Sequence, residues 1–362
     1  SAGSGAGRGG ARLPQAAARA GEAGRAPHRA GRRAKRVAHI ACAVEQIESL
    51  QQPHWLSPLT LSLSVDRTDA LFTPSEGFVV RADLEHAAAY TGSDFAYSRL
   101  LAEGSTYTGD PGGVVLATRI RGGIGWSRES NGSDIGLNPQ KRFFAGGSNS
   151  VRGFGPFRLG PTVLGVDAVT WLAAVDTVPD DGVVDGAGCS VAEINDRSCD
   201  PRPLASRPGA FEARPAGGEL LVEGNIELRF PLPFAGGKLR GAAFLDAGQV
   251  WAENDRFDGR ELVATPGVGV RYLSPVGPIR IDAGFNLQGS RSLPVVTTEV
   301  EECIRGTEGC VPLESARLPL KNTDEIVVLD QRIDYQPFTS GLDTLAGWFQ
   351  RFQLHFAIGQ AF

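Results

Sequence analysis

Ten segments of the chain alternate between apolar and polar or small residues, and this period of two constrains the fold more than any other feature. The clearest segment closes the chain, where one face carries Phe352, Leu354, Phe356, Ile358 and Phe362. Successive side chains of a β-strand point to opposite sides, so such a strand has one apolar face. Comparable segments run over 36–47, 59–67, 77–87, 95–107, 114–126, 220–230, 238–251, 263–273 and 279–287. The pattern predicts about ten strands of the length that a tilted membrane strand requires.

The polar faces of these segments hold single charges spaced among small residues. Segment 220–230, for example, places Glu223, Glu227 and Arg229 on one side. A soluble β-sandwich also alternates, but its exposed face is expected to be densely charged. The spacing favours an antiparallel transmembrane β-barrel with a crowded polar lumen, and a sandwich stays the alternative on pattern alone. No run of about 18 apolar residues predicts a transmembrane helix.

The connections between the predicted strands alternate between short turns and long polar stretches. The longest are residues 128–218 and 288–349, which we interpret as long loops at one end of a barrel. The predicted barrel region therefore spans residues 36–362. Residues 1–35 are rich in Ala, Gly and Arg and carry almost no large apolar side chain. We interpret this segment as disordered, or as an artefact of a misplaced start.

The polar stretches contain two closely spaced pairs of cysteines. Cys189 and Cys199 form one pair, and Cys303 and Cys310 form the other, which suits disulfides in an oxidising compartment. Their spacing fits no zinc pattern, so no metal is expected. The sequence shows no nucleophile elbow, phosphate loop or metalloprotease helix, so we expect no catalytic residues and no cofactor. The net charge of −5 does not favour a nucleic-acid partner.

Several motifs, in this order, resemble those of the Omp85 superfamily, which includes BamA- and TamA-type proteins and the bacterial surface antigen D15 domain. Residues 142–154 look like the family's hallmark loop, with Val151, Arg152, Gly153 and Phe154 as its core. Residues 244–251 and 267–282 are similar to the strand that receives this loop and to the following hairpin. Residues 356–362, which end in an aromatic residue, resemble the β-signal of outer-membrane proteins.

The resemblance implies a sixteen-stranded barrel that follows periplasmic POTRA domains. About ten strands are predicted in this chain, so they correspond to the C-terminal part of such a barrel. A partial barrel would leave long unpaired strand edges, which a lipid environment does not tolerate. We therefore expect the sequence to be a fragment of a larger protein.

The resemblance also implies that the long loop folds back into the lumen, where its arginine contacts acids on the barrel wall. Arg152 is that arginine here, and Glu227 and Asp246 are the matching acids. Both acids belong to the inward set of their strands, and Gly153 lets the backbone pass close to a wall. An arginine between two carboxylates gains charge-assisted hydrogen bonds. The alternative is a surface arginine beside two ordinary lumen carboxylates.

The closing strand has two expected roles, carried by Phe356, Ile358, Gly359 and Phe362. Its alternation predicts a lipid-facing strand, with Phe362 on the same face as Phe356. The resemblance adds recognition by the assembly machinery and one side of a lateral gate. A gate strand would release its native partner and pair with a client strand. Gly359 is compatible with weaker packing there.

The resemblance implies a non-enzymatic insertase for β-barrel proteins in the outer membrane of a Gram-negative-type bacterium. Expected partners are outer-membrane lipid, unfolded outer-membrane proteins, and assembly lipoproteins or periplasmic proteins that bind the missing POTRA domains. Three alternatives stay open: a two-partner secretion pore, the barrel of a patatin-like phospholipase fusion, and a passive porin. The phospholipase would need a G-x-S-x-G motif, which this chain lacks.

Overall fold

The computed structural model describes residues 55–127, 136–174, 186–233, 237–254, 257–275, 277–312, 319–335, 344–360 and 362. The predicted disordered segment 1–35 and the predicted strand 36–47 lie outside these residues. Within the described ranges, no helix combines the length and the apolar character needed to cross a membrane.

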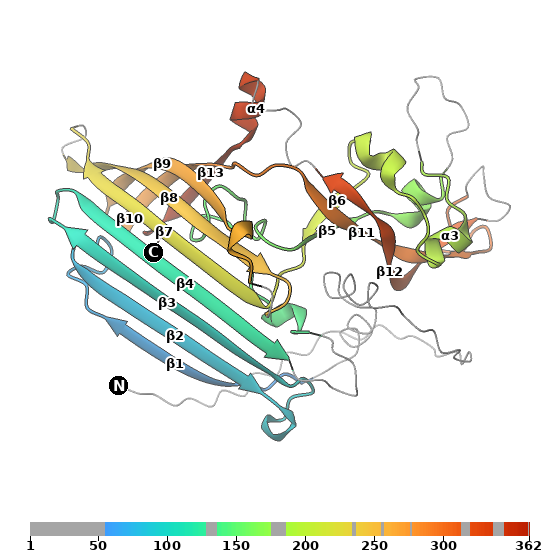
Figure 1. Cartoon of the computed structure of the whole chain (residues 1–362), viewed down its shortest axis with the longest axis horizontal. Coiled ribbons are helices and arrows are strands. Elements are labelled where there is room, and N and C mark those ends of the chain that lie inside the picture. Colours follow the sequence, from blue (N-terminus) through green and yellow to red (C-terminus); the bar gives the residue numbers. More distant parts are fainter. Residues whose placement is uncertain are drawn as a thin grey trace.

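Most of the strands form one antiparallel sheet, whose order is β1-β2-β3-β4-β7-β8-β9-β10-β13. Figure 1 shows it as a curved wall that occupies one side of the molecule. The strands are β1 (Leu59–Asp66), β2 (Gly77–Ala87), β3 (Tyr97–Gly109), β4 (Val115–Ser127), β7 (Leu220–Pro231), β8 (Leu239–Trp251), β9 (Val263–Ser274), β10 (Gly277–Phe285) and β13 (Phe352–Ile358). Among the described residues β1 and β13 are the two ends of this sheet and do not pair. The all-β, antiparallel prediction is confirmed, whereas closure into a barrel stays a prediction.

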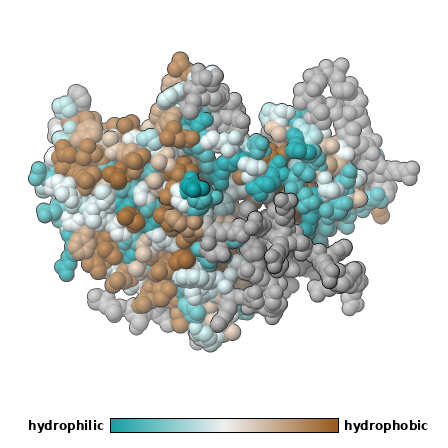
Figure 2. All heavy atoms as spheres, viewed as in Figure 1, coloured by the Kyte–Doolittle hydropathy of each residue, from teal (hydrophilic) through white to brown (hydrophobic). Residues whose placement is uncertain are grey.

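The two faces of this sheet differ sharply in chemistry. On β10, Ile281 is 54% exposed while its neighbour Asp282 is 0% exposed. We call the face that carries Asp282 the inner face and the face that carries Ile281 the outer face. Apolar side chains gather on the outer face, as Figure 2 shows over the strands of the sheet. Since soluble monomers rarely expose such large apolar patches, the outer face requires an apolar neighbour.

The two long connections contain a second sheet with the order β12-β11-β5-β6. Its strands are β5 (Thr162–Gly165), β6 (Glu212–Pro215), β11 (Arg291–Glu302) and β12 (Leu320–Tyr335). Strand β5 from the first connection pairs in parallel with β11 from the second. The described parts of the two segments predicted as long loops therefore pair with each other and lie beside the first sheet (Figure 1).

Short helices complete the fold. They are η1 (Ala89–Thr91), η2 (Pro139–Lys141), η3 (Ala168–Leu172), α3 (Val191–Asn195), η4 (Arg202–Ser206), η6 (Gly259–Glu261) and α4 (Leu345–Gln350). Helices η3, α3 and η4 cover the second sheet and share its apolar core. That core includes Leu172, Ile194, Leu204, Val295 and Leu329, all at most 1% exposed. The second sheet thus has the apolar interior of a water-soluble domain.

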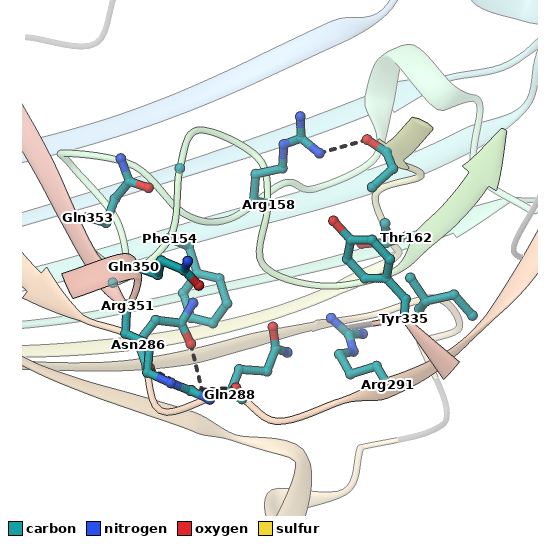
Figure 3. A pocket seen from close by; sticks show the side chains of 14 residues that line it. Phe154, Arg158, Thr162, Asn286, Gln288, Arg291, Tyr335, Gln350, Arg351 and Gln353 are labelled. Atoms are coloured by element: carbon teal, nitrogen blue, oxygen red, sulfur yellow. Dashed lines mark hydrogen bonds between the residues drawn. The ribbon is translucent and has the colours of Figure 1, made fainter. Parts of the chain in front are cut away.

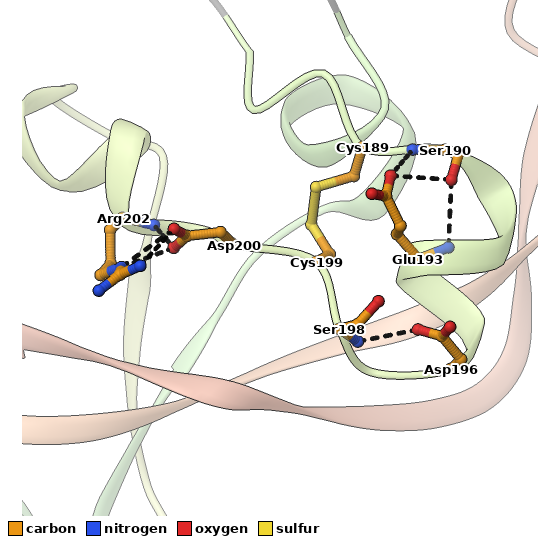
Figure 4. The surroundings of a disulfide bond; sticks show 8 residues. All are labelled: Cys189, Ser190, Glu193, Asp196, Ser198, Cys199, Asp200 and Arg202. Atoms are coloured by element: carbon orange, nitrogen blue, oxygen red, sulfur yellow. Dashed lines mark hydrogen bonds and ion pairs between the residues drawn. A yellow bond between two sulfur atoms is a disulfide. The ribbon is translucent and has the colours of Figure 1, made fainter.

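Both predicted cysteine pairs lie at bonding distance in the second sheet and its connections. The sulfurs of Cys189 and Cys199 are 2.07 Å apart, and those of Cys303 and Cys310 are 1.98 Å apart. The Cys189–Cys199 bridge encloses α3 (Figure 4). Ser190 caps this helix by accepting a hydrogen bond from the backbone N–H of Glu193, whose carboxylate accepts from Ser190 in return. The bridge and the capping box stabilise a helix too short to form alone.

Candidate functional site

Residues 142–160, which we call the motif loop, fold against the inner face of the first sheet. Backbone bridges join Phe143 to Gly218 and Ala145 to Leu159, so the loop begins and ends close together. Its tip is closed by a hydrogen bond of 3.0 Å from the N–H of Gly147 to the carbonyl of Phe154. The loop is held by an apolar cluster of Phe143, Ala145, Val151, Phe154, Leu159, Leu221 and Val250. Burial of this cluster fixes where the tip lies on the wall.

Arg152 at the tip is 1% exposed and lies between two carboxylates of the wall. Its Nε and Nη2 donate to Oδ2 and Oδ1 of Asp246 at 2.8 and 2.9 Å, which is a bidentate pair. Its Nη1 donates to Glu227, and its backbone N–H donates to Asp246 at 3.0 Å. The guanidinium carbon also lies 3.4 Å from the centroid of the Phe244 ring. The structure therefore brings Arg152 together with Glu227 and Asp246.

These groups belong to a larger network of charges on the inner face. Arg271 bridges two acids, with Nη2 2.8 Å from Glu227 and Nη1 2.7 Å from Asp282. Arg229 donates to Glu227 at 2.8 Å, and Arg280 lies 3.1 Å from Asp282. Four arginines thus surround three carboxylates, all of them buried. Because each carboxylate accepts several charge-assisted hydrogen bonds, the charged forms are stabilised away from water.

Asp282 was not predicted as a partner of the loop, although its Oδ2 lies 3.6 Å from Nη1 of Arg152. Sequence alternation did assign it to the inward face of its strand. The missing information was that three strands, β7, β8 and β10, present their acids at the same height as the loop tip.

Two glycines let the backbone of the tip approach the wall. A Cβ on Gly153 would lie 2.3 Å from Cγ2 of Thr265 on β9. A Cβ on Gly284 of β10 would lie 2.3 Å from the carbonyl oxygen of Arg152. Both distances are impossible for real atoms, so each position requires glycine for close approach. The sequence indicated this for Gly153 but not for Gly284.

The closing strand contacts the tip through a residue that the sequence analysis did not select. Nε2 of His355 on β13 lies 2.8 Å from the carbonyl oxygen of Arg152. A carbonyl oxygen only accepts, so Nε2 carries the hydrogen and donates it. His355 holds an inward position on β13, and this was the only signal in the sequence.

The residues before Arg152 are also held by side chains of the wall. Arg119 donates to the carbonyl of Asn149 at 3.0 Å, and Asn225 donates to the carbonyl of Ser150 at 2.9 Å. The Ser150 hydroxyl donates to Glu223. Backbone carbonyls of the tip are therefore satisfied by β4 and β7 as well as by β13, which fixes the tip on several strands at once.

The closing strand pairs with β10 and presents Phe356 and Ile358 on the outer face, where they are 69% and 66% exposed. Phe362, which was predicted on the same face, lies elsewhere. It packs with Val79, Tyr107 and Ala117, and its ring lies 5.2 Å from the guanidinium carbon of Arg119. Gly359 has φ +97°, so the strand ends before it and the two-residue period does not continue. The prediction that Phe362 faces outward is wrong.

An inner wall of paired charges, an apolar outer face and an inserted arginine loop define the class of β-sheet membrane proteins with an occupied interior. A comparison with protein families matches the Omp85 superfamily domain to residues 19–295. The chain therefore belongs to the Omp85 superfamily, whose members are outer-membrane β-barrels with roles in transport or assembly. The resemblance predicted from the motifs is confirmed.

A search of solved structures finds similarity to the crystal structure of BamA from Haemophilus ducreyi lacking POTRA domains 1–3. The two chains are 18% identical and superpose with a TM-score of 0.45. The match covers 64% of this chain and 39% of the BamA chain. This chain therefore spans well under half of the solved protein that it matches.

Proposed function

We propose that this chain belongs to an insertase that folds β-barrel proteins into the outer membrane. In this role the motif loop braces the wall, and β13 forms one side of a lateral gate. The observation that carries the proposal is the buried Arg152, which lies between Glu227 and Asp246 while His355 of β13 holds its backbone. One residue thereby connects the middle of the wall to the strand at its end.

The brace depends on buried charges, which are destabilising when they lose their partners. Removing one partner of a buried ion pair typically costs about 3–5 kcal/mol, because the other charge stays buried without compensation. Arg152 has two carboxylate partners and a third within 3.6 Å. When the motif loop is seated, Arg152 supplies the ion pair of Asp246 on β8 and adds a partner to Glu227 on β7, so the loop stabilises this part of the wall. This dependence makes the loop a control element for the shape of the wall.

The gate follows from the position of β13 at the end of the sheet. Its pairing with β10 covers Phe352 to Ile358, and among the described residues its other edge pairs with no strand. An exposed strand edge offers N–H and C=O groups to an incoming strand, which is β-augmentation. Outer-face residues such as Leu354 and Phe356 would keep that edge at the level of lipid. Clients of the proposed gate are unfolded outer-membrane proteins.

The proposed partners are outer-membrane lipid along the outer face, and lipoproteins or periplasmic proteins that bind POTRA domains of the longer protein. The test uses the full-length protein in its own bacterium. Arg152→Ala is expected to lower the amount of folded porins in the outer membrane severalfold. Arg260→Ala, which changes an exposed arginine of η6, is the matched control. Normal porin levels with Arg152→Ala would remove the brace from the proposed mechanism.

A second variant separates the brace from the gate. His355→Ala removes the contact between β13 and the tip but leaves Glu227, Asp246 and Asp282 paired with arginine. If the proposal is right, folded porin levels fall while the protein itself still accumulates in the membrane. If the pore alternative is right, client folding is unchanged and secretion of a partner protein is impaired.

A further inference from the structure

A cavity of about 200 Å³ lies where the motif loop, the second sheet and the start of β13 meet (Figure 3). One water molecule needs roughly 10–15 Å³ of such space, so the cavity has room for a small chemical group. Its walls come from segments far apart in the sequence: Phe154 and Arg158 of the loop, Arg291 and Tyr335 of the second sheet, and Gln353 of β13. We call it the arginine cavity.

Three arginines line the arginine cavity, one from each part of the structure that meets there. They are Arg158 from the motif loop, Arg291 from β11 and Arg351 next to β13. None of its described lining residues is Asp or Glu. The other polar lining groups, such as the Gln288 and Gln353 amides and the Tyr335 hydroxyl, are neutral. Among the described lining residues, Arg158 and Arg291 therefore bring positive charge into the cavity with no acidic side chain in its wall.

The hydrogen bonds of two of these arginines leave most of their donors uncommitted. Within the described part of the chain, Arg158 donates to the carbonyl of Ala213 at 2.7 Å, and Arg291 donates to the carbonyl of Gly160 at 3.0 Å. A guanidinium has five N–H donors, so one neutral acceptor satisfies a small part of it. Arg351 donates to the carbonyl of Gln288 at 2.9 Å.

The contrast with the charge network around Arg152 is informative. There, every arginine lies beside a carboxylate, as expected for a buried charge. Burial lowers the pKa of the Arg291 guanidinium, and the charge of Glu261 offsets only part of that shift. A half-buried cation without a bonded acid is stabilised by an anion that enters from outside.

We propose that the arginine cavity binds a phosphate group, carried either by a free small molecule or by a lipid headgroup. A phosphate presents several acceptor oxygens and up to two negative charges, and arginine binds it in bidentate geometry. A carboxylate has only two oxygens and one negative charge, so it can form fewer charge-assisted hydrogen bonds with three arginines than a phosphate can. The bound phosphate would join the motif loop to β11 and to the start of β13. The proposal stands independently of the insertase proposal.

The test measures thermal unfolding of the full chain in non-ionic detergent, with inorganic phosphate against chloride at matched ionic strength. Phosphate at several times its dissociation constant is expected to raise the Tm by roughly 2–4 °C. Arg291→Gln is expected to weaken phosphate binding by about tenfold or more, since it removes charge-assisted hydrogen bonds. Arg158→Gln changes an exposed side chain, so it is expected to fold and tests the site even if Arg291→Gln misfolds. Arg305→Gln, an exposed arginine outside the cavity, is the control.

The source of the phosphate is resolved in bicelles that contain phosphatidic acid or phosphatidylcholine, by native mass spectrometry of the bound lipid. If the protein retains phosphatidic acid and both cavity variants lose it, the phosphate belongs to a lipid headgroup. A Tm shift with inorganic phosphate alone identifies a free phosphate compound. The proposal is overturned if acetate shifts the Tm as much as phosphate does. It is equally overturned if neither probe binds, or if both cavity variants bind as tightly as the Arg305→Gln control.

Discussion

The two sheets of this protein bury opposite kinds of side chain. The nine-stranded sheet buries arginines and carboxylates on its inner face and exposes apolar side chains on its outer face. The four-stranded sheet buries an apolar core and carries the two disulfide bridges. Figure 2 reflects the difference, with brown over the strands of the first sheet and teal over much of the second.

The difference indicates two surroundings for one chain. An apolar outer face is stable beside lipid, and a charged inner wall is stable only when its charges pair with one another. A sheet with water on its outside must instead gain stability from apolar burial and crosslinks. Each sheet should therefore respond to substitutions that leave the other unaffected.

Removing the central charge of the first sheet should have the largest effect. Arg152→Ala leaves Glu227 and Asp246 buried with fewer partners, so we expect a loss of about 3–5 kcal/mol in the stability of the first sheet. The measurement is the temperature at which the folded, fast-migrating form disappears from semi-native gels. Arg260→Ala is the control. An unchanged transition would mean that the inner charges do not stabilise the wall.

Opening the apolar core of the second sheet should have the next largest effect. Leu329 on β12 is 1% exposed, and Leu329→Ala is expected to destabilise the second sheet by about 2–5 kcal/mol. Limited proteolysis should then cut within residues 288–349 while the first sheet stays resistant. Ile281→Ala, which shortens an exposed outer-face side chain, should leave this digestion pattern unchanged. Simultaneous loss of both sheets would contradict the division.

Removing one crosslink should have an intermediate effect that is confined to the second sheet. The double variant Cys189→Ser with Cys199→Ser is expected to lower its stability by about 3 kcal/mol or less, because the unfolded chain gains entropy. Denaturant unfolding, followed through the fluorescence of Trp171 beside that core, measures the change. The neighbouring exposed Ser198→Ala is the matched control. An effect on the gel transition of the first sheet would show that the two sheets unfold together.

A titration should give the smallest effect. Burial, and then the nearby charge of Glu325, raises the pKa of Glu299 on β11 above its ordinary value of 4.5. The folded state therefore favours the protonated carboxyl. The associated stability is fully present below the ordinary pKa and is lost as the pH rises through the raised pKa. Glu299→Gln should remove this loss.

The measurement for this titration is the Tm of the Glu299→Gln variant and of the unsubstituted chain between pH 4 and pH 8. The gain in Tm should be largest at the high end and should vanish towards pH 4. Glu302→Gln, at an exposed position three residues further along β11, is the control. A gain that does not depend on pH would exclude titration of Glu299 as its cause.

Sequence alternation predicted the nine described strands of the first sheet and the faces of their residues. It placed Glu227, Asp246 and Asp282 inward because a strand fixes the direction of every second side chain. It could not place His355 against Arg152, since that contact joins residues 203 positions apart in the chain. The insertion of the loop itself came from the family resemblance and not from the period.

Two features escaped the sequence analysis for identifiable reasons. Strands β5 and β6 are four residues long, too short for alternation to be recognised, and they are ordered by pairing with a distant segment. Phe362 was assigned by counting in twos across Gly359, whose positive φ ends the extended backbone. In both cases tertiary contacts override the local pattern.

The parallel pairing of β5 with β11 has a consequence for the order of folding. Thr297 donates to the carbonyl of Val166 across 131 positions of chain, so this pairing closes a very long loop. Such non-local contacts lower folding rates, because chain entropy is lost before the contact stabilises anything. The pairing of β5 with β11 should therefore form late in folding. Until then, β5 and β6 are exposed edges that a chaperone could shield.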